Sequence, residues 1–222
     1  MNTPWPNKSP EPTAVGAGSS AVAVHGFWSG VAQFFSLGGF ERMCITSSYE
    51  ERALQTLSEL GIPTSFVTQR RRTLHCECED LVSIGLDLFG REQRLERRAA
   101  AHWQSMLAEA DVGGIVLVAV SGFRSFDYQR KIIERKLAAG LTIEQIVCVS
   151  ALPGFSEHHT GRAIDIGTPD SPPVTEEFEQ TPAFGWLTRR GQDFGFRMTY
   201  PRDNRFGVIY EPWHWVFEEP AA

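Results

Sequence analysis

Residues 114–122 read GIVLVAVSG, an apolar run of strand length that is rich in Val and Ile. β-branched residues at this density favour a buried strand, and we expect it to be central in a sheet. The residues that follow, FRSFDYQRKIIERKLAAG (123–140), predict a helix. Ser125 suits its N-cap, Asp127 its first turn and Gly140 its end. The middle of the chain is therefore a strand followed by a helix.

Further helices and strands are expected on both sides of this segment, in mixed order. Helices are predicted over 49–60, 91–110 and 181–196, with a shorter one after Thr142. Thr181 and Pro182 occupy the N-cap and first helical positions that these residue types prefer. Short antiparallel strands are predicted over 162–167, 197–201, 206–210 and 214–219. Because no regular βαβ alternation is present, the fold class is α+β, with a small antiparallel sheet flanked by helices.

Composition limits what the protein can do. The 222 residues include 42% hydrophobic residues, enough to bury a core. The net charge of −6 argues against binding to a nucleic-acid backbone, which needs clustered cations. The basic run over 70–72 is short, and we interpret it as a solvated loop. The spacing in HCEC (75–78) is too tight for a tetrahedral metal site, so we expect reduced thiols there.

The N-terminal segment differs from the rest of the chain. Residues 1–42 are rich in Pro, Gly, Ser and Ala, and we interpret them as a disordered or low-complexity leader before a catalytic domain over 43–222. Their apolar part is interrupted by polar residues and glycines, so it predicts neither a membrane span nor a secretory signal. The compartment stays open between the cytoplasm and the cell envelope.

Two short stretches carry the residues suited to chemistry. SEHHTGRAID (156–165) contains His158 and Asp165, and YEPWHW (210–215) contains Glu211 and His214. Two imidazoles and a carboxylate suit zinc, and three protein ligands leave a fourth position open for catalysis. Spacing alone leaves a second possibility open, in which these histidines are ordinary core or solvated residues.

The same stretches resemble one known family. SEHHTGRAID is similar to the S-x-H-x-x-x-x-x-x-D signature of VanY-type D-alanyl-D-alanine carboxypeptidases, and EPWHW is similar to their E-x-W-H. SGFRSFDYQ (121–129) resembles a third family segment, and the three occur in the family's order. These enzymes belong to a zinc peptidase group that includes lysostaphin-like enzymes and the hedgehog signalling domain. The resemblance covers about 84–217.

The resemblance implies a role for each matching residue. His158, Asp165 and His214 would bind one zinc ion, and Glu211 would be the general base. Arg124 would pair with the substrate, holding either its terminal carboxylate or the developing oxyanion. Ser156 and Gln129 are candidates for polar contacts with substrate, although Gln129 also fits a surface position on a helix. His159 matches no fixed role and is left as a residue lining or supporting the pocket.

The implied reaction is hydrolysis of the C-terminal D-alanine from a peptidoglycan stem peptide. An L,D-carboxypeptidase or an endolysin-like peptidase with the same zinc site is the alternative, because the motifs are shared. A binding module of the hedgehog kind is a third possibility, but such a module needs no base beside an open metal position. We expect a monomer with this peptide as its partner, and no nucleic acid.

Overall fold

Two antiparallel sheets organise the part of the chain that the structure, a computed structural model, describes: residues 46–68 and 72–219. The helices are α1 Thr46–Glu59, α2 Ser65–Thr68, α3 Arg97–Val112, α4 Phe126–Ala138, α5 Ile143–Val149 and α6 Pro182–Arg190. The strands are β1 Leu81–Leu86, β2 Glu92–Glu96, β3 Val118–Ser121, β4 Ala163–Gly167, β5 Phe196–Met198 and β6 His214–Phe217. The 3-10 turns are η1 Glu157–Thr160, η2 Glu176–Gln180 and η3 Gly191–Phe194.

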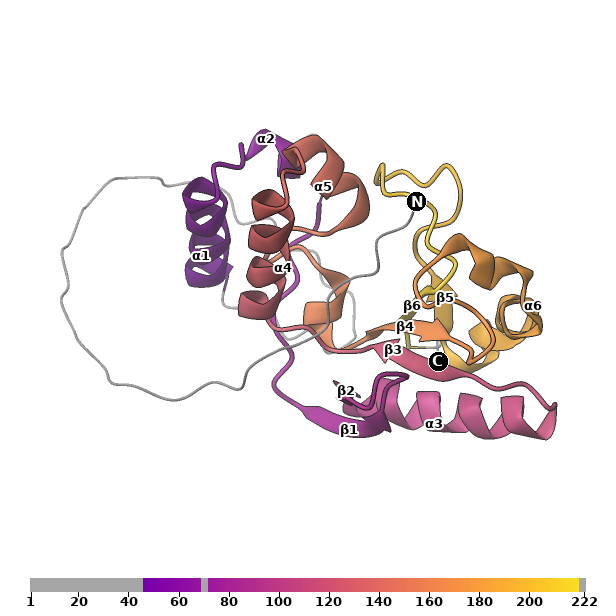
Figure 1. Cartoon of the computed structure of the whole chain (residues 1–222). Helices are drawn as coiled ribbons and strands as arrows, with labels where there is room; N and C mark the ends of the chain where they lie inside the picture. The colour runs from indigo at the N-terminus through magenta and orange to yellow at the C-terminus, as the bar shows by residue number, and fades with distance from the viewer. Residues whose placement is uncertain (1–45, 69–71, 220–222) are drawn as a thin grey trace. The chain divides into compact units, whose positions relative to one another are not determined.

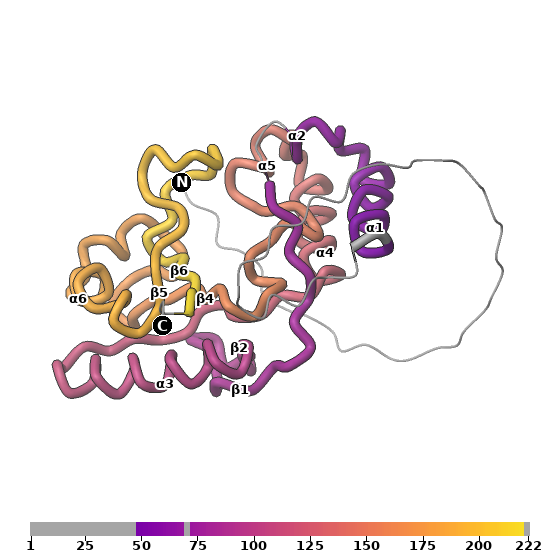
Figure 2. The backbone as a smooth tube through the Cα atoms, turned by 180° about the vertical axis from the view of Figure 1, so that it is seen from behind, coloured from indigo at the N-terminus to yellow at the C-terminus, as the bar shows by residue number. Residues whose placement is uncertain are grey.

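The larger sheet has the strand order β3-β4-β6-β5, and every neighbouring pair is antiparallel. The strands β1 and β2 form a separate two-stranded sheet. Helix α3 runs beside the sheets, whereas α1, α4 and α5 form a second group (Figure 1, and from behind in Figure 2). The expected α+β class, with a small antiparallel sheet flanked by helices, is confirmed.

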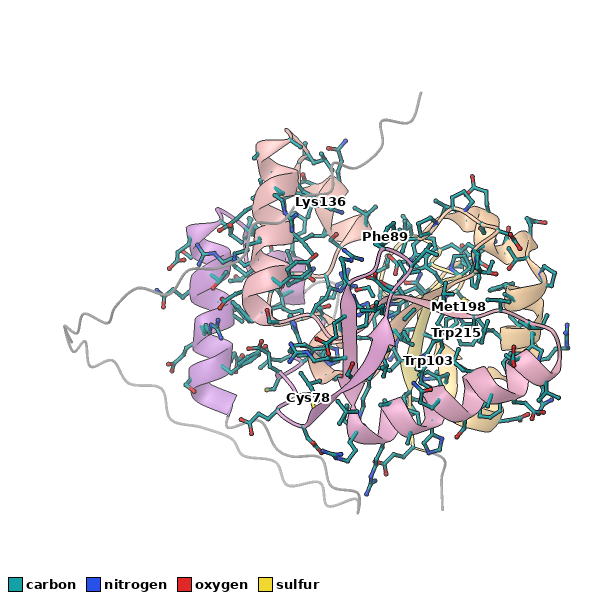
Figure 3. All side chains as sticks on the ribbon, turned by 60° about the horizontal axis from the view of Figure 1, so that its bottom comes forward. Cys78, Phe89, Trp103, Lys136, Met198 and Trp215 are labelled. Carbon is teal, nitrogen blue, oxygen red and sulfur yellow. The ribbon has the colours of Figure 1, made fainter. Side chains whose placement is uncertain are left out.

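Two apolar clusters hold these elements together. The first joins α3 to the larger sheet and includes Trp103, Ile164 and Trp215; Figure 3 labels both tryptophans. The second joins α1, α4 and α5 and includes Leu57 and Ile133. Each of these side chains is at most 3% exposed. Burying a side chain of this size contributes about 1.5–3 kcal/mol, so packing within these two clusters stabilises the fold.

Several helix starts follow the predicted capping. The Ser125 hydroxyl accepts from the backbone N–H of Tyr128 at the start of α4. Thr142 and Gln145 form a reciprocal capping box at the start of α5. Thr181 caps α6, with Pro182 at its first position. These caps depend on residues close in sequence, which explains why the pattern alone predicts them.

Several expectations about strands and helices are wrong. The run over 114–122 forms β3 at the edge of the sheet rather than at its centre. Its outer side is covered instead by the β1–β2 connection, where Leu88 donates its backbone N–H to the Ala119 carbonyl over 3.1 Å. An apolar run cannot distinguish a central strand from a covered edge.

The helix expected over 91–110 begins only at Arg97, because residues 92–96 pair with β1 as a strand. The Glu96 carboxylate then caps the helix by accepting from the N–H groups of Arg98 and Ala99. The strand expected over 206–210 is absent from the described fold. There the Asn204 side chain accepts from Phe206 and Val208, which turns the chain into a loop.

The remaining expectations divide between described and undescribed residues. The leader over 1–42 lies outside the described residues, so the domain boundary stays a prediction. The reduced thiols expected in HCEC are correct for Cys78, which is free, and wrong for Cys76, which is disulfide-bonded. Among the described residues, no helix has both the length and the apolar character that a membrane crossing requires.

Candidate metal centre and active site

Three predicted metal ligands converge at the larger sheet. Asp165 lies on β4 directly opposite His214, the first residue of β6, because these two strands pair in that register. His158 comes from η1, one turn before β4. The chain reverses between them at Gly161, whose φ of +67° is accessible to glycine at little cost. Strand pairing therefore aligns two of the ligands, and a tight turn delivers the third.

The donor atoms of these three side chains lie within 4.8 Å of one another. Asp165 Oδ1 is 3.3 Å from His158 Nε2 and 3.0 Å from His214 Nδ1. Two donors bound to a tetrahedral zinc at its usual ligand distances are about 3.4 Å apart. All three residues are at most 6% exposed. The two separations from Asp165 are thus close to those of donors around one small ion.

The hydrogen bonds of His158 leave one ring nitrogen available to a metal. Its Nδ1 is 2.6 Å from the Gly122 carbonyl oxygen, which can only accept, so Nδ1 carries the proton. Its Nε2 is buried and has no hydrogen-bond partner among the described residues. An unpaired buried nitrogen is costly unless something binds it. A metal ion beside Asp165 satisfies this requirement, so the residues present fit such an ion.

His214 is held on both of its ring nitrogens. Its Nδ1 faces Asp165, and its Nε2 is 2.9 Å from the carboxylate of Glu157. Burial by itself lowers the pKa of His214, but the hydrogen bonds to Asp165 and Glu157 raise it to about 10. The ring of Tyr200 stacks on the His214 ring, with 4.9 Å between the two ring centroids. Each ring nitrogen of His214 therefore faces a carboxylate.

The other two ligands have pKa values shifted in the direction that metal binding needs. Burial, followed by the nearby Arg124 guanidinium, lowers the pKa of His158 to about 4, so its ring is neutral. Burial acts to raise the pKa of Asp165, but His158, His214 and Arg124 together hold it below its ordinary value. A neutral imidazole and an ionised carboxylate are the forms that bind zinc.

A pocket opens onto this cluster. His158 and His214 line it together with Glu211, Arg124 and Ser156. Glu211 lies in the turn before β6, where its carbonyl accepts from the His214 N–H over 3.1 Å. Burial raises the pKa of Glu211 to about 7, and the charge of His214 opposes that shift. A carboxyl group with this pKa can take up and release a proton near neutral pH.

Arg124 is fixed at the pocket by several contacts. Its Nη2 is 3.5 Å from Asp165 Oδ2, and its Nη1 is 3.5 Å from the side-chain oxygen of Gln129. Its backbone carbonyl accepts from His159 Nδ1 over 2.6 Å. The guanidinium therefore lies beside the ligand cluster between Asp165 and Gln129, and the His159 contact holds the backbone of Arg124.

The structure separates the other predicted residues. Ser156 is 2% exposed and lines the pocket. Gln129 is fully buried, is not among the pocket-lining residues, and donates to the Ala151 carbonyl over 2.7 Å. The surface position considered for Gln129 is therefore wrong. His159 accepts from the Gly154 N–H over 3.1 Å and donates to the Arg124 carbonyl, so it joins the segment before η1 to the loop between β3 and α4.

Three titratable side chains that line the pocket were not predicted from the sequence. Glu157 lies within SEHHTGRAID (156–165), but its residue type alone predicted no role there. Tyr200 precedes a proline in the segment 197–201, which was expected only to form a strand. Arg72 lines the pocket and donates to the Val147 carbonyl over 3.1 Å. The interpretation of the basic run as a solvated loop is wrong for Arg72. A carboxylate next to a candidate ligand was the signal that could have identified Glu157.

Comparison with known proteins assigns the family. The model of the VanY D-alanyl-D-alanine carboxypeptidase family matches residues 92–220, more than half of the chain. The chain belongs to this family, and the resemblance found in its motifs is confirmed. A D-alanyl-D-alanine carboxypeptidase of Enterococcus faecalis is 26% identical over 186 residues, covering 78% of this chain and 66% of that protein.

Two solved structures are similar in fold as well as in sequence. The LdcB LD-carboxypeptidase is 30% identical with a TM-score of 0.58, and the match covers 64% of this chain and 69% of that one. VanYB in complex with D-alanine-D-alanine is 28% identical with a TM-score of 0.52, and the match covers 65% of this chain and 81% of that one. The chain spans 39% to 66% of the length of the curated relatives that it matches.

Proposed function

We propose that this protein is a zinc-dependent carboxypeptidase that hydrolyses the C-terminal D-alanine of peptidoglycan stem peptides. We assign the catalytic domain to 43–222 and expect it to act as a monomer. One observation carries the proposal: the donor atoms of His158, Asp165 and His214 lie within 4.8 Å of one another, and the two histidines line a pocket with Glu211 and Arg124, in a VanY family member. The E. faecalis relative is named for D-alanyl-D-alanine carboxypeptidase activity, and VanYB was solved with D-alanine-D-alanine.

In this proposal His158 Nε2, Asp165 Oδ1 and His214 Nδ1 hold the zinc ion. Bound zinc supplies Lewis acidity, which polarises the scissile carbonyl and lowers the pKa of the attacking water to roughly 7. The chemistry of the donor set agrees with this choice, because two imidazoles, one carboxylate and an open position are typical of catalytic zinc.

We assign the proton transfers to Glu211. Its carboxylate takes a proton from the attacking water as the new carbon–oxygen bond forms at the scissile carbonyl. It then gives that proton to the nitrogen of the departing D-alanine as the carbon–nitrogen bond breaks, so the carboxylate is regenerated. The pKa of about 7 supports both halves of the cycle, since the group is neither a strong acid nor permanently ionised.

Arg124 is the proposed cation for the substrate. Its position 3.5 Å from the ligand Asp165 favours an interaction with the carbonyl oxygen that becomes negative during attack, over one with a more distant carboxylate. A guanidinium can donate two parallel hydrogen bonds to such an oxygen or carboxylate. Ser156 is the proposed polar contact beside it. Gln129 then acts on Arg124 rather than on the substrate.

Metal analysis combined with a D-alanine release assay tests this function. The full chain is purified, its zinc content is measured, and it is incubated with a pentapeptide stem ending in D-Ala-D-Ala. We expect one zinc per chain and D-alanine release that a chelator abolishes and added zinc restores. A chain that binds no zinc, or that releases nothing from any stem peptide, would overturn the proposal.

An L,D-carboxypeptidase is the second candidate, favoured by the similarity to the LdcB LD-carboxypeptidase. The same assay distinguishes the D,D from the L,D activity when a tetrapeptide stem is used as substrate. In that stem the terminal D-alanine is bonded to the carboxyl group of an L-configured centre. Release from the tetrapeptide but not from the pentapeptide would identify the L,D activity. The endolysin-like alternative predicts cleavage inside the stem, and the masses of the products distinguish it.

A further inference from the structure

We propose that Glu157 is a positioning residue for the zinc site: it holds the proton of His214 on Nε2, so that Nδ1 is the metal-binding nitrogen. The inference rests on the proposed zinc function and extends it beyond the three ligands and the base. Glu157 adjoins one ligand in the chain, His158, and contacts another, His214, from a distant strand.

The first step of the argument concerns which nitrogen of His214 can bind a metal. Nδ1 lies 3.0 Å from Asp165 Oδ1, within the cluster of donor atoms, whereas Nε2 points to Glu157 at 2.9 Å. A carboxylate can only accept, so the proton shared along the second contact belongs to Nε2. A neutral imidazole carries one ring proton, and the lone pair is then on Nδ1.

The second step concerns how firmly Glu157 is held. Its side chain is only 15% exposed, and it also accepts a hydrogen bond from the Tyr200 hydroxyl. Tyr200 stacks on the His214 ring, with 27° between the ring planes. The carboxylate, the imidazole and the phenol thus fix one another, and rotation of His214 would break the contact with Glu157.

The third step concerns charge. Arg124 lies 3.5 Å from Asp165, so a cation already stands beside the place where a divalent ion would bind. The negative charge of Glu157 lies on the opposite side of His214 and offsets this repulsion. A carboxylate that accepts from the far nitrogen of a ligand histidine also makes the metal-binding nitrogen more basic, and losing it typically weakens metal binding 10- to 100-fold.

Zinc affinity of the full chain, measured by competition with a chromophoric chelator, tests the proposal. We expect Glu157→Ala to weaken zinc binding roughly 100-fold and Glu157→Gln roughly 10-fold, because glutamine keeps an accepting oxygen but loses the charge. Glu157→Gln is close to isosteric, so it keeps the test available where the alanine variant does not fold. The matched control is Glu77→Gln, which removes another half-buried carboxylate that accepts from the Phe126 N–H, away from the pocket.

The outcomes separate this inference from the function on which it rests. If the parent chain binds zinc and both Glu157 variants bind it within about twofold of the parent, the inference alone is overturned. If Glu77→Gln weakens zinc binding as much as Glu157→Gln, the effect is general and the inference is again overturned. A parent chain without zinc affinity overturns both. Weakened binding in the Glu157 variants, with the control unchanged, supports the assigned role.

Discussion

Asp165 on β4 and His214 on β6 face each other across one antiparallel register position, and Asp165 Oδ1 lies 3.0 Å from His214 Nδ1. In such a pair the Cβ atoms are about 4.5–5.5 Å apart, so the two side chains can bind one ion without any loop movement. The ligand pair is thus built into the sheet. Any change that shifts the β4–β6 register by one residue would turn one of these two side chains to the opposite face of the sheet and separate the ligand pair.

Replacing His214 by alanine should remove zinc and activity together. The variant keeps only two of the three proposed ligands and leaves Asp165 and Glu157 without the imidazole between them. We expect no stoichiometric zinc in the purified variant by elemental analysis, while far-UV circular dichroism reports whether the fold persists. A folded variant with one zinc per chain would remove His214 from the ligand set.

Replacing Glu211 by glutamine should separate metal binding from turnover. The variant keeps the size of the side chain but cannot accept a proton, so kcat should fall by at least about 10²-fold. Zinc content should stay at one per chain, because Glu211 is not among the three clustered ligands. Steady-state D-alanine release and metal analysis of the same preparation check both parts. Near-normal turnover would assign the base to another group.

Replacing Arg124 by lysine should damage catalysis although the charge is kept. Lysine cannot present two parallel donors, and a hydrogen bond to a charged group is worth about 1.5–3 kcal/mol. We therefore expect kcat/KM to fall roughly 10- to 100-fold. If Arg124 acts on the developing oxyanion, kcat carries most of the loss; a loss mainly in KM would assign Arg124 to the substrate carboxylate instead.

Replacing Gly122 by alanine should destabilise the fold and disturb the site. An added Cβ would lie 2.5 Å from the backbone oxygen of Arg94, and the Gly122 carbonyl is the acceptor for His158 Nδ1. Overpacking of this kind costs about 1–3 kcal/mol. Gly185→Ala in α6 is the control, since its nearest contact is an ordinary 3.5 Å and alanine favours helices by up to about 1 kcal/mol. Urea unfolding measures the free energy of unfolding of both variants. Equal values for Gly122→Ala and Gly185→Ala would contradict the prediction.

Replacing Asp87 by asparagine should destabilise the protein at neutral pH but not in acid. Burial acts to raise the pKa of Asp87, but its hydrogen bonds to Arg91 and Phe89 hold it below its ordinary value. A carboxyl group with a lowered pKa in the folded state stabilises the fold above its unfolded pKa, near 3.9, and loses that effect as the pH falls through the folded pKa. We expect the difference in unfolding free energy between parent and variant to be largest near pH 7. This difference in unfolding free energy should shrink below about pH 4. A difference that stays constant with pH would show that the charge of Asp87 does not contribute to stability.

Asp87 also links the β1–β2 sheet to the metal cluster. It accepts from the Gln93 side chain over 2.9 Å, and Gln93 in turn accepts from the Gly122 N–H over 2.8 Å. The Gly122 carbonyl then accepts from His158. None of these contacts could be expected from the sequence, where residues 91–96 have the composition of a helix. The pairing of β2 with β1 overrides that local preference.

The amino-acid sequence by itself determined the features that depend on near neighbours. The caps of α4, α5 and α6 and the two ligand-bearing stretches could all be recognised from residue type and spacing. Only the tertiary structure decided that β3 is an edge strand, that Glu157 faces His214, and that Arg72 reaches the pocket. The physical reason is that these relations join segments far apart in the chain, where strand pairing and burial choose the partners.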